Sequence, residues 1–313
     1  MFLVKDLRVN GANRVILESA TGLAELGWDV TLAVSDRRYH QWLGKPLRQL
    51  SAEEAHRQHF DMALSTFYTT MFDLDRVDCS VRWQYFQDNY YRYGTRTDER
   101  LDQIEYAYLH RNSGKFVVSH YLAGLLRAKG VSSTVVQPGV DTKQFFPEPV
   151  EPPRDHQRAL VEGHCRSYKA LPESYEAIPS TWEIWGLGLD DHRLGAIEMH
   201  VQVPQHDLRR IYGACDALVK LERGGGHPLP PLEAMACAVP VLVSDEGGHL
   251  DYCIEDYNAL IASSPAHGRT LLAELASDQR LQRTLAENGL AVAKACTWDR
   301  MVTKLDRALR SES

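Results

Sequence analysis

The sequence lacks the features that mark metal-binding, disulfide-rich and membrane-spanning proteins. Its six cysteines are scattered, with no C-x-x-C pair and no local His/Cys spacing typical of zinc ligands, which argues against a zinc site or a disulfide framework and fits a reducing compartment. No apolar run approaches the roughly 18 to 20 residues that span a bilayer. The first residues also lack the long apolar segment of a secretory signal. We therefore expect a cytoplasmic protein, with room for peripheral contact at the inner face of a membrane.

An excess of basic charge is also missing. Lys and Arg total 35 against 42 for Asp and Glu, a formal net charge of −7, which argues against a partner bound through general basicity, such as nucleic acid. Phosphate recognition would therefore have to be local. What the chain does have is a globular composition, 44% hydrophobic and 25% charged over 313 residues, which suits two domains of ordinary size.

The hydrophobic pattern predicts two α/β domains in tandem. An apolar run at 1–4 leads through a glycine-containing turn into an amphipathic stretch at 12–27 and a further apolar run at 30–36, the beginning of a parallel sheet. A linker at 145–157 holds four prolines in thirteen residues, after which the alternation restarts. Further strands are expected at 61–65, 83–87, 115–119, 133–141, 158–164, 182–188, 196–204, 216–222 and 239–245, and further helices at 120–130, 173–177, 206–215, 231–237 and 268–276.

Two turns could hold a phosphate. Asn10 and Gly11 precede the first helix, where backbone N–H groups and the positive helix end can face an anion, although the same residues also make a plain tight turn. Arg166 and Lys169 follow the first strand of the second domain, at the carboxyl end of a sheet, where open α/β folds bind ligands. A basic pair at that position can equally be solvated.

The most informative segment is 221–245, LERGGGHPLPPLEAMACAVPVLVSD. Its glycines allow a backbone to approach a ligand closely, and Pro230 and Pro231 suit the first turn of a helix. Glu233 lies about one turn into that helix, where its carboxylate can accept hydrogen bonds from a ribose diol. The alternative is that Glu233 only complements the helix dipole.

This segment resembles the donor-site signature of the family 4 retaining glycosyltransferases, which have the GT-B fold. Further resemblance lies in NGANRVILESATGLAELGWDVTLAV, FVVSHYLAGLLRAKG, VPQHDLRRIYGACDALV and KACTWDRMV, so it covers most of the chain. The resemblance implies two Rossmann-like doubly wound domains that face a central cleft: an acceptor-side domain at 1–147, a donor domain at 148–295 and a helix at 296–313 that returns to the first domain.

The same resemblance implies an activity. It predicts metal-independent transfer of a sugar from a nucleotide-diphosphate sugar to a glycan, lipid or small-molecule acceptor, without a cofactor and without nucleic acid as a partner. Gly11 matches the glycine that approaches the donor diphosphate, Lys169 the lysine that contacts it, and Glu233 the glutamate that holds the ribose. Arg166 is a shifted stand-in for a second cation, because His164 occupies the family's usual position. Leu229, Gly226 and His227 belong to the same donor turn, and Gly247 and Gly248 match a loop lining the site.

The chain departs from the family at the donor sugar. Gly225 stands where the first glutamate of the pair is usual, eight residues before Glu233. Glu222 either replaces that carboxylate as a catalytic sugar contact or is a solvated residue at a strand end. Gln87 replaces a histidine that touches the sugar, and Asn10 replaces a glycine. We take Gln87, Asp88 and Tyr90 as acceptor-side candidates, while the aromatic residues around them are equally suited to a core.

These departures leave two further functions open. One is a catalytically silent nucleotide-sugar-binding partner of another glycosyltransferase, which the absence of a glutamate at position 225 would allow. The other is a GT-B nucleotide-sugar epimerase. Turnover separates the three, because only an enzyme transfers the sugar or epimerises the donor.

Overall fold

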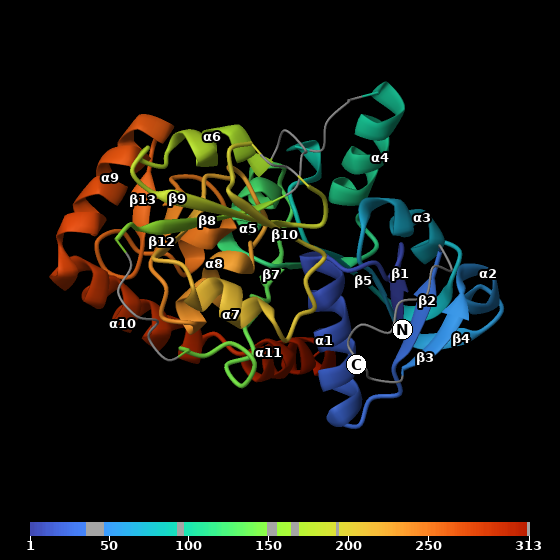
Figure 1. Ribbon diagram of the computed structural model, residues 1–313. Coiled ribbons are helices and arrows are strands. Elements are labelled where there is room, and N and C mark those ends of the chain that lie inside the picture. The colour runs from blue at the N-terminus through green and yellow to red at the C-terminus, as the bar shows by residue number, and fades with distance from the viewer. Residues whose placement is uncertain (36–46, 93–96, 149–154, 164–168, 192–193, 312–313) are drawn as a thin grey trace. The chain divides into compact units, whose positions relative to one another are not determined.

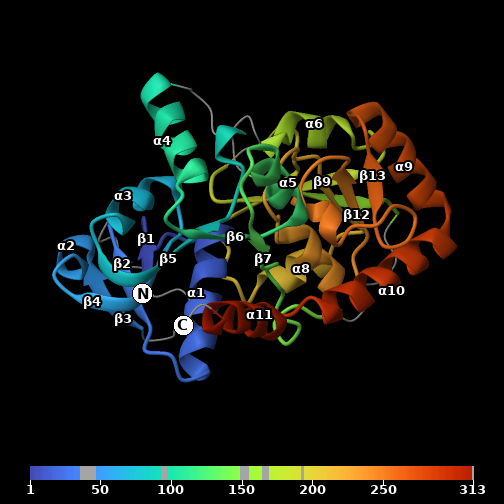
Figure 2. The same cartoon turned by 180° about the vertical axis from the view of Figure 1, so that it is seen from behind.

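The computed structural model describes residues 1–35, 47–92, 97–148, 155–163, 169–191 and 194–311. The chain forms two compact units (Figures 1 and 2). Unit 1 comprises Met1–Pro138 and Trp298–Ser313, and unit 2 comprises Gly139–Thr297. Each unit is built around one parallel sheet.

Unit 1 contains a seven-stranded sheet in the order β3-β2-β1-β4-β5-β6-β7, and every neighbouring pair is parallel. The order reverses between β1 and β4, as in doubly wound folds. Its strands are β1 (Phe2–Val4), β2 (Thr31–Val34), β3 (Arg48–Ser51), β4 (His59–Ser65), β5 (Asp78–Phe86), β6 (Gly114–Val117) and β7 (Thr134–Val135). Its helices are α1 (Gly11–Glu25), α2 (Ala52–Ala55), α3 (Met71–Leu74), α4 (Asp98–Leu109), α5 (His120–Ala128) and α11 (Trp298–Arg310).

The last helix, α11, lies beside α1 in both views (Figures 1 and 2). A Cβ on Gly22 would come within 2.4 Å of the Val302 side chain, so the absence of a side chain at position 22 lets the two helices pack closely. The Trp28 indole donates a hydrogen bond of 2.7 Å to Asp306. Helix α11 is therefore part of unit 1.

Unit 2 contains a six-stranded parallel sheet in the order β10-β9-β8-β11-β12-β13. Here the strand order reverses between β8 and β11. The strands are β8 (Arg158–Gly163), β9 (Glu183–Gly188), β10 (Glu198–Val201), β11 (Ala217–Lys220), β12 (Val241–Ser244) and β13 (Leu260–Ala262). The helices are α6 (Leu171–Glu176), α7 (Leu208–Gly213), α8 (Pro230–Ala236), α9 (Pro265–Ser277) and α10 (Gln279–Ala295).

Both faces of the unit 2 sheet are buried. Along β12, Val241 and Val243 belong to a core cluster with α7 and α8, whereas Leu242 belongs to a second cluster with α6 and α9. Figure 1 shows the corresponding helices on the two sides of this sheet. Strands buried on both faces read as continuous apolar runs, which is why the sequence pattern located them. The predicted fold class, two Rossmann-like parallel sheets, is confirmed.

The boundary between the units follows Pro138, whereas the sequence placed it after 147. Phe145 explains the difference, because it is fully buried in the core cluster that includes Tyr212 of α7. The Val140 N–H also donates to the Cys296 carbonyl at 2.9 Å. Residues 139–147 are therefore built into unit 2.

Candidate functional site

The reversal of strand order in unit 2 places charged side chains together at the carboxyl ends of β8 and β11. This edge of an open α/β sheet is where ligands bind. Nζ of Lys220 lies 2.6 Å from Oε2 of Glu162 and 2.9 Å from Oε2 of Glu222. The side chains of Lys220 and Glu222 are 3% and 2% exposed, so their ion pair is buried.

Lys169 joins this cluster from the segment before α6. Its Nζ lies 2.9 Å from Oε1 and 3.1 Å from Oε2 of Glu222. The Lys169 side chain is 23% exposed, which makes it the more accessible of the two ammonium groups. The two lysines and two glutamates, which we call the switch-point cluster, carry two positive and two negative formal charges.

Lys220 stays charged in this setting. Burial by itself lowers the pKa of Lys220, but the Glu162 and Glu222 carboxylates more than offset burial and raise that pKa above its ordinary value. A buried lysine with two carboxylate partners is favoured in its ionised form. Lys220 is therefore protonated at neutral pH.

Hydrogen bonds from two other elements fix the backbone that carries Glu222. The Leu221 N–H donates to the Ser174 hydroxyl of α6 at 3.0 Å. The Ser244 hydroxyl, at the end of β12, donates to the Glu222 carbonyl at 2.7 Å. Glu222 is thus held in place on both sides, and the expectation of a solvated residue at this position is wrong.

The loops that follow β11 and β12 are joined through their backbones. Gly225 and Gly247 form a parallel bridge, and the Gly248 N–H donates to the Gly225 carbonyl at 2.8 Å. Gly247 has a φ of +138°, and a Cβ there would lie 3.2 Å from the Gly225 nitrogen. Gly225 accordingly contributes backbone to this region and no side chain.

His227 is enclosed in the same turn. Its ring centroid lies 4.9 Å from that of Tyr252, and neither of its buried ring nitrogens has a hydrogen-bond partner in the described part of the chain. Burial lowers the pKa of His227 to about 4; nearby His249 adds to this effect and Asp251 opposes it. The imidazole is therefore neutral at pH 7.

Helix α8 begins directly after this turn. Leu229 is its buried N-cap residue, and Glu233, 8% exposed, lies in its first turn. The Tyr212 hydroxyl of α7 donates to Oε2 of Glu233 at 2.9 Å, and burial together with this carboxylate raises the pKa of Tyr212 well above its ordinary value. Glu233 thus lies near the N-terminus of the helix and is also held in place by a side-chain hydrogen bond.

The candidates of unit 1 occupy separate positions in that unit. Gly11 is the first residue of α1, after the Asn10 side chain that caps it. Gln87 follows β5; it is 8% exposed, and its Nε2 has no partner among the described residues. Asp88 accepts from the Asn89 N–H at 2.8 Å. Tyr90 is 1% exposed and donates to the Thr66 carbonyl at 3.5 Å, as expected of a core residue.

The structure brings Lys169 and Glu222 into contact, and it places Gly225, Gly226, His227, Leu229 and Glu233 in the adjoining loop and helix of the same unit. Arg166 lies outside the described residues. Sequence reasoning missed Lys220, the buried cation of the cluster, and Glu162, its partly exposed second partner. The available signal was a lysine at the end of an apolar strand, ALVK, where an unpaired charge would be costly.

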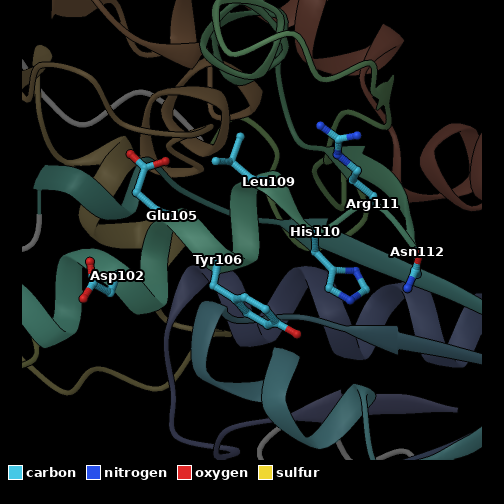
Figure 3. Close-up of a pocket in the computed structure, with 7 residues that line it drawn as sticks. All are labelled: Asp102, Glu105, Tyr106, Leu109, His110, Arg111 and Asn112. Atoms are coloured by element: carbon cyan, nitrogen blue, oxygen red, sulfur yellow. The ribbon is translucent and has the colours of Figure 1, made fainter.

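Unit 1 also has a surface pocket of about 550 Å³ along the end of α4, lined by residues from Asp102 to Asn112 (Figure 3). Two of its lining residues contact Asp75: the Tyr106 hydroxyl donates to this carboxylate at 2.6 Å, and the His110 ring lies 3.1 Å from it. None of the predicted site residues lines this pocket. Among the described residues, no group of three or more His, Cys, Asp or Glu side chains could hold a metal ion. No helix in the described ranges is long and apolar enough to cross a membrane.

Comparison with known proteins agrees with this architecture. Residues 190–311 match the family of glycosyl transferases, group 1. An uncharacterized glycosyltransferase of Methanocaldococcus jannaschii is 33% identical over 90 residues, a segment that spans 28% of this chain and 26% of that relative. The fold is similar to that of sucrose-phosphate synthase from Thermosynechococcus elongatus, with a TM-score of 0.79, 16% identity and coverage of 99% of this chain and 98% of the other. It is also similar to Anabaena HepE in complex with UDP-glucose, with a TM-score of 0.80, 12% identity and the same coverages.

The two parallel sheets and these structural neighbours define a protein of the GT-B fold. The segment that matches the group 1 glycosyltransferases, 190–311, comprises the later part of unit 2 and helix α11 of unit 1. The resemblance found in the sequence is thereby confirmed for the fold, and the family match supports it over 190–311.

Proposed function

We propose that the protein is a retaining, metal-independent glycosyltransferase that uses a nucleotide-diphosphate sugar. The observation that carries this proposal is the Lys169 ammonium, held 2.9 Å from Glu222 at the switch point of the unit 2 sheet. A cation at the carboxyl edge of such a sheet suits the negative charge of a donor diphosphate. Structural neighbours described in complex with UDP and with UDP-glucose support this donor class.

In this proposal each unit 2 residue has one task. Lys169 binds the diphosphate, Glu233 accepts hydrogen bonds from the ribose, and the backbone around Leu229 approaches the phosphates. Arg166 supplies a second cation, and Gly225, Gly226 and His227 border the sugar. Gly11, Gln87, Asp88 and Tyr90 stay predictions for unit 1. A panel of donors and acceptors is needed to identify the donor base, the sugar and the acceptor.

The chemistry needs charge stabilisation more than a protein base. The bond from the anomeric carbon to the diphosphate oxygen breaks, and Lys169 stabilises the charge that develops on the departing group. The acceptor oxygen bonds to the anomeric carbon on the same face, and its proton passes to the departing phosphate oxygen. The anomeric configuration is then retained, and no metal ion or cofactor takes part.

The test is turnover with glucose donors carrying UDP, GDP, dTDP and ADP, each offered glycan, lipid and small-molecule acceptors. We expect release of nucleoside diphosphate that matches sugar transfer, a retained anomeric configuration by proton NMR, and unchanged rates in EDTA. Loss of transfer in EDTA that manganese restores would contradict the metal-independent mechanism. Donor binding without release would favour the silent partner, and epimerised donor would favour the epimerase.

A further inference from the structure

We infer that Glu222 is a positioning residue for Lys169 and that Lys220 is the buried counter-ion that keeps Glu222 in place. This inference rests on the proposed role of Lys169 at the donor diphosphate. It replaces the expectation that Glu222 touches the donor sugar. The basis is the arrangement of the switch-point cluster, in which every carboxylate oxygen of Glu222 faces an ammonium group.

Both oxygens of Glu222 contact Lys169, and one of them also contacts Lys220. Oε1 lies 2.9 Å from Nζ of Lys169. Oε2 lies 3.1 Å from the same nitrogen and 2.9 Å from Nζ of Lys220. The carboxylate therefore bridges the two lysines, and its geometry serves the ammonium groups rather than a sugar hydroxyl.

The three side chains of this bridge differ in their exposure to solvent. Glu222 and Lys220 are 2% and 3% exposed, whereas Lys169 is 23% exposed. The buried pair is anchored further by Glu162, 2.6 Å from Lys220, and by the backbone hydrogen bonds at Leu221 and Ser244. Glu222 and Lys220 thus lie inside the cluster, and Lys169 is the ammonium group with access to solvent.

This arrangement fits a lysine that has to meet an incoming anion. A long, flexible lysine side chain loses rotamer freedom when it is ordered, and a charge that is already in place needs no reorganisation during the reaction. Glu222 can order Lys169 only if its own charge is balanced, because an unpaired buried carboxylate is costly. Lys220 provides that balance without reaching solvent.

The first test needs no donor. Acylation of Lys169 by an amine-reactive acetate ester, followed by mass spectrometry, reports how firmly its amine is held. We expect Glu222→Gln to raise the acylation rate of Lys169 at least about tenfold. The matched control is Glu183→Gln, which removes a carboxylate paired at 3.0 Å with Arg158 at the opposite edge of the same sheet, and should leave the rate unchanged. An unchanged rate in Glu222→Gln would overturn the inference.

The second test is a double-mutant cycle with Lys169→Ala, Glu222→Gln and the combination, read out as the Kd of the nucleoside diphosphate and as the KM and kcat of transfer. In the wild-type background, we expect Glu222→Gln to weaken nucleotide binding at least about tenfold. In the Lys169→Ala background, the same substitution should weaken binding less than about twofold, because a residue that acts through another has no effect once that other residue is removed. Effects that multiply would show that Glu222 contacts the donor itself and would overturn the inference.

A second variant keeps the inference testable if Glu222→Gln folds poorly. The charge-balanced variant Lys220→Met/Glu222→Gln removes one charge of each sign and should also release Lys169 to acylation. Donor binding separates the inference from the function on which it rests. A wild type that binds no nucleoside diphosphate rejects the proposed function, while the acylation rates still decide whether Glu222 holds Lys169.

Discussion

Replacing Lys220 with methionine should destabilise unit 2 strongly. The substitution keeps an unbranched side chain of similar length but leaves Glu222, 2% exposed, with Lys169 alone, and leaves Glu162 without the ammonium 2.6 Å away. Breaking a buried ion pair by removing one partner costs about 3–5 kcal/mol. Because Lys169 still balances part of the charge on Glu222, we expect about 3 kcal/mol.

Urea unfolding of the full chain, followed by circular dichroism, measures this loss as a shift in midpoint at constant slope. Lys129→Met is the control, because Lys129 and Glu105 form a comparable contact of 2.8 Å but are 31% and 39% exposed, and exposed pairs contribute about 0–1 kcal/mol. Adding Glu222→Gln to Lys220→Met should recover part of the stability. A Lys220→Met variant that loses no more than the Lys129→Met control would refute the reasoning.

Two further predictions concern the loops beside the cluster. In the folded protein the pKa of His227 is about 4, against 6.5 ordinarily, so the unfolded chain binds more protons between these two pH values. The free energy of unfolding therefore falls by up to about 3 kcal/mol as the pH drops from 6.5 to 4. His227→Phe should make this fall shallower in urea unfolding measured across that range, and an unchanged dependence on pH would contradict the assignment. Gly247→Ala should lower the melting temperature and cost about 1–3 kcal/mol, because φ is +138° and a Cβ would lie 3.0 Å from the His249 ring. Gly124→Ala, in α5 with open space around it, should cost nothing, and equal losses in both variants would disprove the strain argument.

The sequence was most informative where strands are buried on both faces. Continuous apolar runs such as VLVS at β12 and ALVK at β11 located most strands of unit 2. Two elements carried no such signal. β3 is a polar edge strand, RQLS, and α4 begins with a charged turn and has only a weak apolar periodicity, DERLDQIEYAYL. Their structure depends on pairing with β2 and on packing against neighbouring segments, which local pattern does not reveal.

The candidate site was predicted unevenly for a similar reason. Lys169 and Glu233 belong to motifs with fixed spacing, so the sequence identifies them directly. The partners of Glu222 are Lys220, at the same strand end, and Lys169, which lies 53 residues earlier in the chain. Only the adjacency of β8 and β11, a consequence of the crossover, brings them together. A carboxylate that looks solvated in sequence therefore becomes the centre of a buried cluster.

The most direct test of the account is nucleotide binding by the full chain, measured calorimetrically with UDP, GDP, dTDP and ADP for the wild type, Lys169→Ala and the exposed control Lys143→Ala. We predict that at least one nucleotide binds the wild type and that Lys143→Ala binds it equally well. Lys169→Ala should weaken this binding at least about tenfold, because one charged contact contributes about 1.4 kcal/mol. Wild-type protein that binds none of the four, or a Lys169→Ala variant within about threefold of the wild type, would contradict a donor site built around Lys169.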